Sequence, residues 1–484
     1  MATAIRSLTK NKPAQRLLLA GALVILNALL LVYTESAGYA KPLAIFVFVV
    51  CSVSAVLDLR IAIGILLFIA AMDGFIKGWL GSTAYSLLMK DYFLALAVAC
   101  WLSGRPWRQP DSSLHHPIRL PMIMLGIWVL AQFCNPYTEA RYVASLAGAR
   151  AWLVWLAVFF VVADMLAAPK MVALTVTWIM ILAGVSGAYG ILQHIFGFGF
   201  LGEASPEAMA SASGYEWWTK TGQVVGRIYG TTVHPGAFGT FMGLAILLAV
   251  GSFMTATRWW ARMLPIGAAI IAIAALLLSG TRTAMVAALA GLLSMALAGR
   301  NVRFPLLVAA IVVPGILLTG RLSQLAFERG LDVWHRRVYT FERGWEPLKW
   351  ALSTGGEHPF GLGLDTGVGV PIVLGGRVAV DKAKMVENDF GRALVELGWP
   401  GLFVYGWLVW ACLRTCYGSC MALRGQRPFP LAAAFLGCVV AVVVSLLTGP
   451  VLYVAPGALI FWACVAGGAA LNRHAEALRP RETG

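Results

Sequence analysis

Charged residues are scarce in this chain. They make up only 12% of its 484 residues, whereas hydrophobic residues make up 60%. A soluble domain carries roughly 25% charged residues, so this composition excludes an ordinary water-soluble domain. The sequence therefore predicts an all-α polytopic membrane protein whose helices lie in lipid.

Paired cysteines are missing as well. The eight cysteines are scattered and form no C-x-x-C pair, which excludes a disulfide framework. Cys412, Cys416 and Cys420 recur at helical spacing. Three thiols without a neighbouring histidine are more typical of small apolar residues on one helix face than of a metal site. No metal centre is predicted.

Long apolar runs fill most of the sequence. A transmembrane helix needs about 17 to 25 apolar residues. Candidate spans lie at about 16–33, 41–57, 61–73, 88–103, 120–134, 151–168, 171–196, 236–255, 263–279, 283–299, 304–319, 397–414, 429–447 and 452–471. The run 61–73 is short and 88–103 follows Lys90 and Asp91, so about 12 to 14 spans are predicted. The first run lacks a small-residue cleavage site and is expected to remain as a helix.

Lysine and arginine indicate the orientation, because short cytoplasmic loops carry them in excess. With the N-terminus inside, the inner positive residues are Arg6, Lys10, Lys12, Arg16, Arg60, Arg105, Arg108, Arg119, Lys170, Arg258, Arg262, Arg300, Arg303, Arg414, Arg424, Arg427, Arg473, Arg479 and Arg481. Both termini are then predicted to be cytoplasmic. The net charge of +15 follows from this topology and does not indicate nucleic-acid binding.

The distribution of polar segments along the sequence predicts the domain organisation. Residues 1–319 form transmembrane helices with a smaller outer loop at about 197–235, and 320–396 form a large outer loop. Residues 397–471 form the C-terminal transmembrane helices and 472–484 a cytoplasmic tail. The large loop is too long for a simple connector, and its many aromatic residues at helical spacing predict a mostly helical cap.

Several arginines on the outer side depart from the charge trend. They are Arg141, Arg150, Arg227, Arg282, Arg321, Arg329, Arg336, Arg337 and Arg343. Arg282 lies in LLLSGTRTAMVAAL, between two apolar runs. An arginine at the centre of a membrane helix costs about 2.5 to 3.5 kcal/mol and is usually paired or functional. Snorkelling to the headgroups is the alternative for Arg282, and a solvated loop charge is the alternative for Arg227. Guanidinium groups bind phosphate oxygens bidentately, so a lipid-linked diphosphate is the expected ligand.

Four sequence elements resemble those of one known family. Glu387-Asn388, followed after nine residues by Gly398-Trp-Pro-Gly401, resembles a motif of the O-antigen ligase and polymerase superfamily, which includes bacterial protein O-oligosaccharyltransferases. The stretches LLLSGTRTA, RIYGTTVHPGAFGTF and RGWEPLKWALSTGGEHPFGLGLDTG resemble three further elements of that family. The resemblance covers roughly Arg227 to Trp410 in a fixed order.

This resemblance implies a GT-C-like fold in the bacterial inner membrane. It also implies inverting transfer of a glycan from undecaprenyl diphosphate to an acceptor hydroxyl on the periplasmic face, without a metal or nucleotide-sugar cofactor. The acceptor is left open between another lipid-linked glycan, lipid A-core and a protein hydroxyl. A polymerase of a surface polysaccharide or exopolysaccharide is slightly favoured over a ligase of O-antigen.

The sequence departs from the family pattern at one position. Glu387 stands where the family most often has the histidine proposed as the base. The expected catalytic residues are Glu387, Asn388 and His335, and the expected diphosphate ligands are Arg227, Arg282, Arg336, Arg337 and Arg343. Alternatively, Glu387 caps the following helix or interacts with its dipole, and His335 or His358 is the base. His234 is expected to be structural.

Two functions of other classes are also considered. A transporter or flippase of a lipid-linked or anionic solute would place ionisable residues on broken helices and often shows internal repeats. No clear repeat is visible in the sequence, and most charges lie outside the predicted spans. A non-catalytic assembly or sensor protein would leave the outer arginines and Asn388 unexplained. An enzyme is therefore favoured.

Overall fold

The computed structural model describes residues 40–80, 84–103, 116–138, 142–197, 216–218, 224–299, 348–364, 366, 388–449, 451–452 and 454–478. Within these ranges the regular structure is helical except for two short antiparallel strands, β1 (Glu216–Trp218) and β2 (Val224–Gly226). The predicted all-α architecture is confirmed apart from this hairpin, which lies in the outer loop expected at about 197–235.

The described helices follow the predicted apolar runs closely. The α-helices are α3 (Ala40–Leu57), α4 (Leu59–Ala71), α5 (Asp73–Leu80), α6 (Ala84–Ser103), α7 (Arg119–Ala131), α8 (Tyr142–Leu153), α9 (Leu156–Met165), α10 (Pro169–Phe196), α12 (Pro235–Thr255), α13 (Met263–Ser279), α14 (Arg282–Gly299), α18 (Asp389–Ala422), α19 (Phe429–Leu446) and α20 (Gly457–Leu478). Short 3-10 turns are η3 (Gln132–Cys134), η4 (Pro136–Thr138) and η5 (Trp260–Arg262).

The described part of the chain contains seven helical segments long and apolar enough to cross a membrane, which confirms a membrane protein. They are Ser145–Met165, Lys170–Phe196, Pro235–Thr255, Trp260–Ser279, Arg282–Gly299, Asp389–Ala422 and Phe429–Leu446. Four shorter apolar helices accompany them: Val47–Leu57, Leu59–Ala71, Arg119–Cys134 and Gly457–Arg473. The predicted spans at 16–33 and 304–319 lie outside the described residues.

Several boundaries differ from those predicted. The run at 151–168 divides between α8 and α9, so Arg150 lies in a helix and not in a loop. Helix α18 begins at Asp389, close to the helix start expected at Glu387, and α20 extends beyond the predicted span to Leu478. Polar residues that are compatible with helical geometry extend a helix at little cost in free energy. A drop in hydropathy therefore does not mark where such a helix begins or ends.

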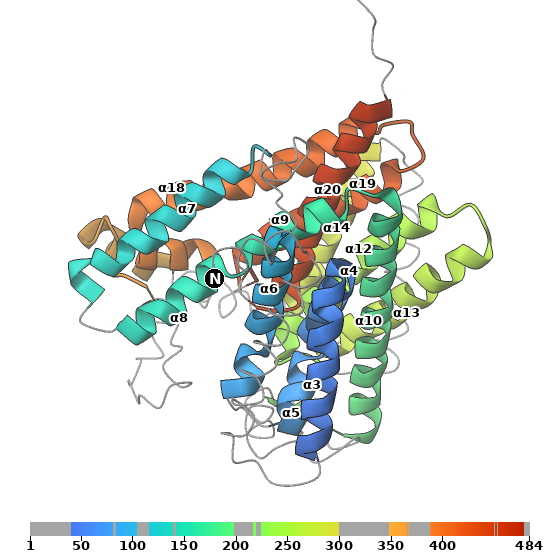
Figure 1. Cartoon of the computed structure of the whole chain (residues 1–484), viewed down its shortest axis with the longest axis horizontal. Helices are drawn as coiled ribbons and strands as arrows, with labels where there is room; N and C mark the ends of the chain where they lie inside the picture. Colours follow the sequence, from blue (N-terminus) through green and yellow to red (C-terminus); the bar gives the residue numbers. More distant parts are fainter. Residues whose placement is uncertain are drawn as a thin grey trace, which may run out of the picture.

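Helix α12 lies at the centre of the bundle, and small residues bring its neighbours close together (Figure 1). Every described residue of α12 from Phe241 to Gly251 is buried. On the adjoining helices, a Cβ added to Gly291 of α14 would lie 2.6 Å from the Gly437 carbonyl oxygen of α19. Close backbone contact through glycine is a common way for membrane helices to associate.

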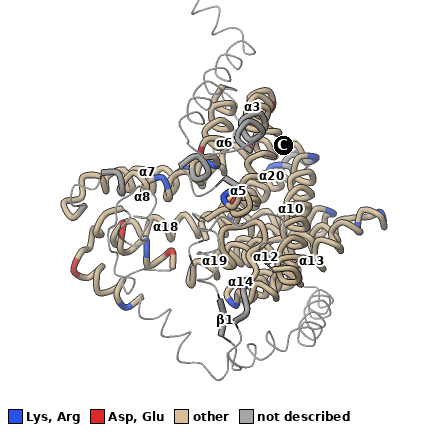
Figure 2. Tube along the Cα trace, turned by 90° about the horizontal axis from the view of Figure 1, so that it is seen from below, with Lys and Arg blue, Asp and Glu red and all other residues tan. Residues whose placement is uncertain are grey.

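Segments predicted to share a side of the membrane are in contact. At the end predicted to be cytoplasmic, Arg427 donates to Thr257 across 3.1 Å. At the opposite end, the backbone N–H groups of Gly74 and Phe75 donate to the Thr231 carbonyl at 2.9 and 3.1 Å. Figure 2 views this second end and places charged residues of α5 near its middle.

Candidate functional site

Arg227 joins two of the sequence elements at this end of the bundle. Its Nε donates to the Ser279 carbonyl at 3.0 Å, and a terminal nitrogen donates to Thr281 Oγ1 at 3.1 Å. Thr281 Oγ1 in turn donates to the Pro235 carbonyl at 2.9 Å. The guanidinium therefore holds the end of α13 beside the start of α12, which places the Arg227 element next to the LLLSGTRTA element.

Arg282 follows directly and is the first residue of α14. It is half-buried, and among the described residues no hydrogen bond or ion pair engages its guanidinium. A positive side chain opposes the partial positive charge of a helix N-terminus. An anion at this position would relieve that repulsion.

The segment between Arg227 and α12 is fixed by hydrogen bonds on both sides. The Gln193 side chain of α10 accepts from the Gly230 N–H at 2.9 Å and donates to the Gly230 carbonyl at 3.1 Å. Gly230 has a φ of +55°, which favours glycine. A Cβ added to Gly74 of α5 would lie 1.9 Å from the Thr232 carbonyl oxygen, so only glycine allows this contact.

Helix α5 begins at a break that follows the apolar helix α4. The preceding α4 has 13 residues, which is about 20 Å of helix and less than the roughly 30 Å of a hydrocarbon core. The short span predicted at 61–73 is thus short in the structure too. Asp73 starts the new helix and is only 2% exposed.

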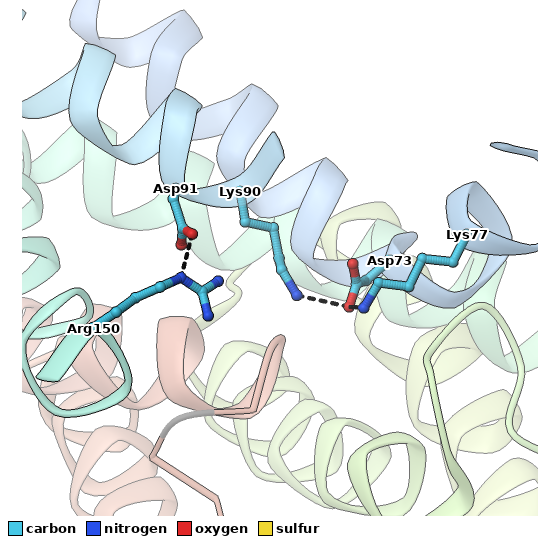
Figure 3. A network of polar contacts seen from close by, with 5 residues as sticks. All are labelled: Asp73, Lys77, Lys90, Asp91 and Arg150. Atoms are coloured by element: carbon cyan, nitrogen blue, oxygen red, sulfur yellow. Dashed lines mark hydrogen bonds and ion pairs between the residues drawn. The ribbon is translucent and has the colours of Figure 1, made fainter. Parts of the chain in front are cut away.

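Asp73 is the centre of a network of charged side chains (Figure 3). Its Oδ2 accepts from Lys77 Nζ at 3.0 Å and from Lys90 Nζ of α6 at 2.7 Å. Beside them, Arg150 of α8 forms an ion pair with Asp91 of α6. Three cations thus face two carboxylates, and the five side chains come from three helices.

His234 connects this network to Arg227. Its Nδ1 accepts from the Ala237 N–H at 3.1 Å, so His234 is the N-cap of α12. Burial lowers the pKa of His234 to about 4, and the nearby charges of Arg227 and Lys77 add to this effect. Arg227 and Lys77 therefore both lie near this imidazole. The structural role expected for His234 is confirmed by its capping bond.

The start of α18 is anchored by two polar residues. Asn388 is the N-cap, and its side-chain oxygen accepts from the Gly391 N–H. Asp389 Oδ2 accepts from the backbone N–H groups of Val451 and Leu452 at 3.3 and 3.4 Å. The N-cap of α18 is therefore Asn388, and an interaction of Glu387 with the helix dipole stays a prediction.

Gly398 divides α18 into the segments 389–397 and 399–422. Its φ of +69° is not helical, and an added Cβ would lie 2.3 Å from the Pro359 carbonyl oxygen. The Trp399 N–H donates to that same carbonyl at 2.9 Å. The kink therefore lets the HPFGLG stretch pack closely against α18. It brings this stretch into contact with the Gly398-Trp-Pro-Gly401 element.

Helix α7 and the residues that follow it also contact the chain around this kink. Trp128 donates its indole N–H to the Leu397 carbonyl, next to the kink, at 2.7 Å. Gln132 donates to the Phe360 carbonyl at 3.2 Å and Asn135 to the Gly361 carbonyl at 3.0 Å. Side-chain donors therefore satisfy backbone carbonyls of an irregular segment, of which Gly361 is buried.

A buried ion pair lies between the kink and the start of α18. Arg392 Nε donates to Glu396 Oε1 at 2.8 Å, and the two side chains are 1% and 0% exposed. Trp152 of α8 donates its indole N–H to Glu396 Oε2 at 2.7 Å, and the Arg392 guanidinium lies 5.1 Å from the centre of the Trp152 ring. Helix α8 therefore contacts the charged network through Arg150 and α18 through Trp152.

The remaining predicted site residues divide into two groups. His358 packs its ring against that of Tyr137, with the ring centres 4.6 Å apart, in the region where the HPFGLG stretch meets α7 and α18. The residues outside the described part of the chain are Glu387, His335, Arg336, Arg337 and Arg343. The described residues contain no group of three or more His, Cys, Asp or Glu side chains that could hold a metal ion.

Comparison with known proteins adds no relative. The chain matches no family model, and no curated protein matches it. Membership of the O-antigen ligase and polymerase superfamily therefore rests on the sequence elements alone and stays a prediction.

Sequence reasoning missed six charged residues of this region as site candidates, among them Lys90 and Asp91 of α6. Asp73 and Lys77 lie in AAMDGFIKGWL, and Arg392 and Glu396 lie four residues apart in FGRALVELGW. Each pair interrupts an otherwise apolar stretch at helical spacing, which is the signal that could have identified them.

Proposed function

We propose that the protein is a membrane glycosyltransferase with a GT-C-like fold that moves a glycan from undecaprenyl diphosphate to an acceptor hydroxyl. The proposal places the reaction on the periplasmic face of the bacterial inner membrane. The products expected from the sequence are O-antigen or exopolysaccharide, made by a polymerase or a ligase.

The observation that carries this proposal is the pair of arginines at the meeting point of α12, α13 and α14. Arg227 is held in place by Ser279 and Thr281, and Arg282 has no anionic partner among the described residues. A fixed guanidinium beside an unneutralised one suits a diphosphate, which needs several charge-assisted hydrogen bonds. These residues also belong to two of the elements that resemble the family.

The chemistry expected at such a site is a displacement at the anomeric carbon of the first sugar. The acceptor hydroxyl oxygen forms a bond to this carbon while the bond from the carbon to the diphosphate oxygen breaks. The hydroxyl proton passes to a base, for which the sequence favours Glu387, and the bonding electrons leave with the diphosphate. Arginines that stabilise this developing charge would lower the barrier.

The proposal is tested by transfer from a purified undecaprenyl-diphosphate-linked glycan in nanodiscs. We expect Arg282→Ala to reduce the transfer rate by a hundredfold or more, in the range observed when one oxyanion donor is removed. Arg258→Ala is the matched control, because Arg258 is exposed at the opposite end of α12 and α13. Full activity of Arg282→Ala would contradict a role for Arg282 in holding the diphosphate.

A second variant addresses the base. We expect Glu387→Gln to lose transfer while it still binds undecaprenyl diphosphate, since the amide cannot accept the hydroxyl proton. Retained transfer would return the role of base to His335 or His358. Binding without any cleavage by the unaltered protein would favour the transporter or flippase.

A further inference from the structure

The charged network on α5, α6 and α8 has more hydrogen-bond donors than acceptors. A lysine ammonium has three N–H donors. Lys77 and Lys90 each donate one to the same Asp73 oxygen. Among the described residues, nothing accepts the two donors that each lysine retains. Both side chains are largely buried, with 15% and 11% exposed, so solvent reaches them only in part.

Arg150 adds further donors on the same side of the network. Among the described residues, only Asp91 accepts from Arg150, through Nε, and none accepts from its two terminal nitrogens. Figure 3 shows the Arg150 and Lys90 side chains extending from neighbouring helices toward the same region. Arg150 is 43% exposed, so a ligand can reach this edge of the network.

The charge balance favours an anion. The network itself has three cations and two carboxylates, and Arg227 lies close enough to His234 to influence it together with Lys77. Unpaired donors on partly buried cations are costly, and phosphate oxygens are their strongest partners. A carboxylate ligand would satisfy fewer donors than a tetrahedral phosphate.

We propose that Lys77, Lys90 and Arg150 form a subsite for a phosphate group of the lipid-linked substrate, and that Asp73 holds the two lysines until phosphate oxygens displace it. This inference rests on the proposed function for the identity of the lipid. Asp73 is then a positioning residue that competes with the ligand. It limits the affinity of the subsite and promotes release of the phosphorylated lipid after transfer.

The test measures binding of undecaprenyl phosphate to the full chain in nanodiscs, with undecaprenol as the control ligand that lacks phosphate. We expect Lys90→Gln and Lys77→Gln each to weaken the binding of undecaprenyl phosphate by about tenfold or more, as the loss of a charged hydrogen bond predicts. Binding of undecaprenol should be unchanged. Lysine variants that bind undecaprenyl phosphate normally would overturn the subsite.

Asp73→Asn tests the competition. Removal of the competing charge should raise the affinity for undecaprenyl phosphate several-fold, and bound lipid should stabilise this variant against heat more than it stabilises the unaltered protein. Asp58→Asn is the matched control, because Asp58 caps the opposite end of α4 and asparagine caps equally well. Equal or weaker binding by Asp73→Asn would show that Asp73 does not compete.

Two further outcomes separate this inference from the proposed function. If inorganic pyrophosphate binds through the lysines while undecaprenyl phosphate does not, the site takes a free phosphate and the lipid assignment is wrong. If undecaprenyl phosphate binds through the lysines but no glycan is transferred, the subsite stands and the proposed transferase activity fails.

Discussion

Replacement of Glu396 by glutamine should strongly destabilise the protein. Arg392 and Glu396 are 1% and 0% exposed, and Trp152 also donates to the glutamate. Glutamine preserves the shape and one acceptor oxygen but leaves the Arg392 guanidinium buried without its counter-charge. Breaking a buried ion pair in this way costs about 3 to 5 kcal/mol. We expect a loss of that size in the free energy of unfolding.

The assay is reversible unfolding in mixed detergent micelles, with Glu357→Gln as the matched control. Glu357 is exposed, so its neutralisation should change the free energy of unfolding by less than about 0.5 kcal/mol.

A double variant separates the ion pair from other effects of the substitution. Arg392→Met combined with Glu396→Gln removes both charges, and replacement of a buried pair by neutral groups is often nearly neutral. The double variant should therefore be more stable than the sum of the two single losses predicts. Strictly additive losses, or a Glu396→Gln variant as stable as the unaltered protein, would refute the reasoning.

Three more predictions concern the elements that surround the site. Gly74→Ala should destabilise the protein by about 1 to 3 kcal/mol, because its Cβ would collide with the Thr232 carbonyl oxygen. Gly78→Ala on the same helix meets nothing within 4 Å and should be tolerated, as thermal unfolding will show. Asn388→Ala should cost about 0.5 to 2 kcal/mol through the lost cap, and Asn388→Asp should restore the stability; if Asn388→Asp folds normally but does not transfer glycan, the amide has a role beyond capping. The depressed pKa of His234, about 4 against an ordinary 6.5, favours the neutral form in the folded protein, so stability should fall as pH drops from about 6.5 to 4, by about 3 kcal/mol in all. His234→Asn keeps a cap without a titrating group and should reduce this pH dependence of the melting temperature; an unchanged slope would contradict the assignment.

Hydropathy predicted most of the helices because lipid demands uninterrupted apolar runs. The runs at 236–255, 263–279 and 283–299 differ by one residue or none from the ends of α12, α13 and α14. Boundaries were less predictable where polar residues continue a helix, as at the start of α6, which begins at Ala84 and not at 88. The break between α8 and α9 has no proline or glycine to mark it in the sequence.

The candidate site was predictable only in part, because its charges come from distant segments. Arg227 and Arg282 could be identified from their position at the ends of apolar runs. Asp73 and Lys77 lie four residues apart on one helix, but the pairing of Asp73 with Lys90 could not be predicted from the sequence, since it depends on how α5 and α6 pack. In the sequence alone, each of these residues is a single charge that interrupts an apolar run, and its partner on another helix cannot be identified.

The central claim is that this membrane protein transfers a glycan from a lipid-linked diphosphate. The most direct measurement incubates the purified protein in nanodiscs with an undecaprenyl-diphosphate-linked glycan and candidate acceptors, and follows the products by mass spectrometry. The account predicts a new glycosidic product together with released undecaprenyl diphosphate. Binding of the donor with every molecule recovered intact, whichever acceptor is supplied, would contradict it.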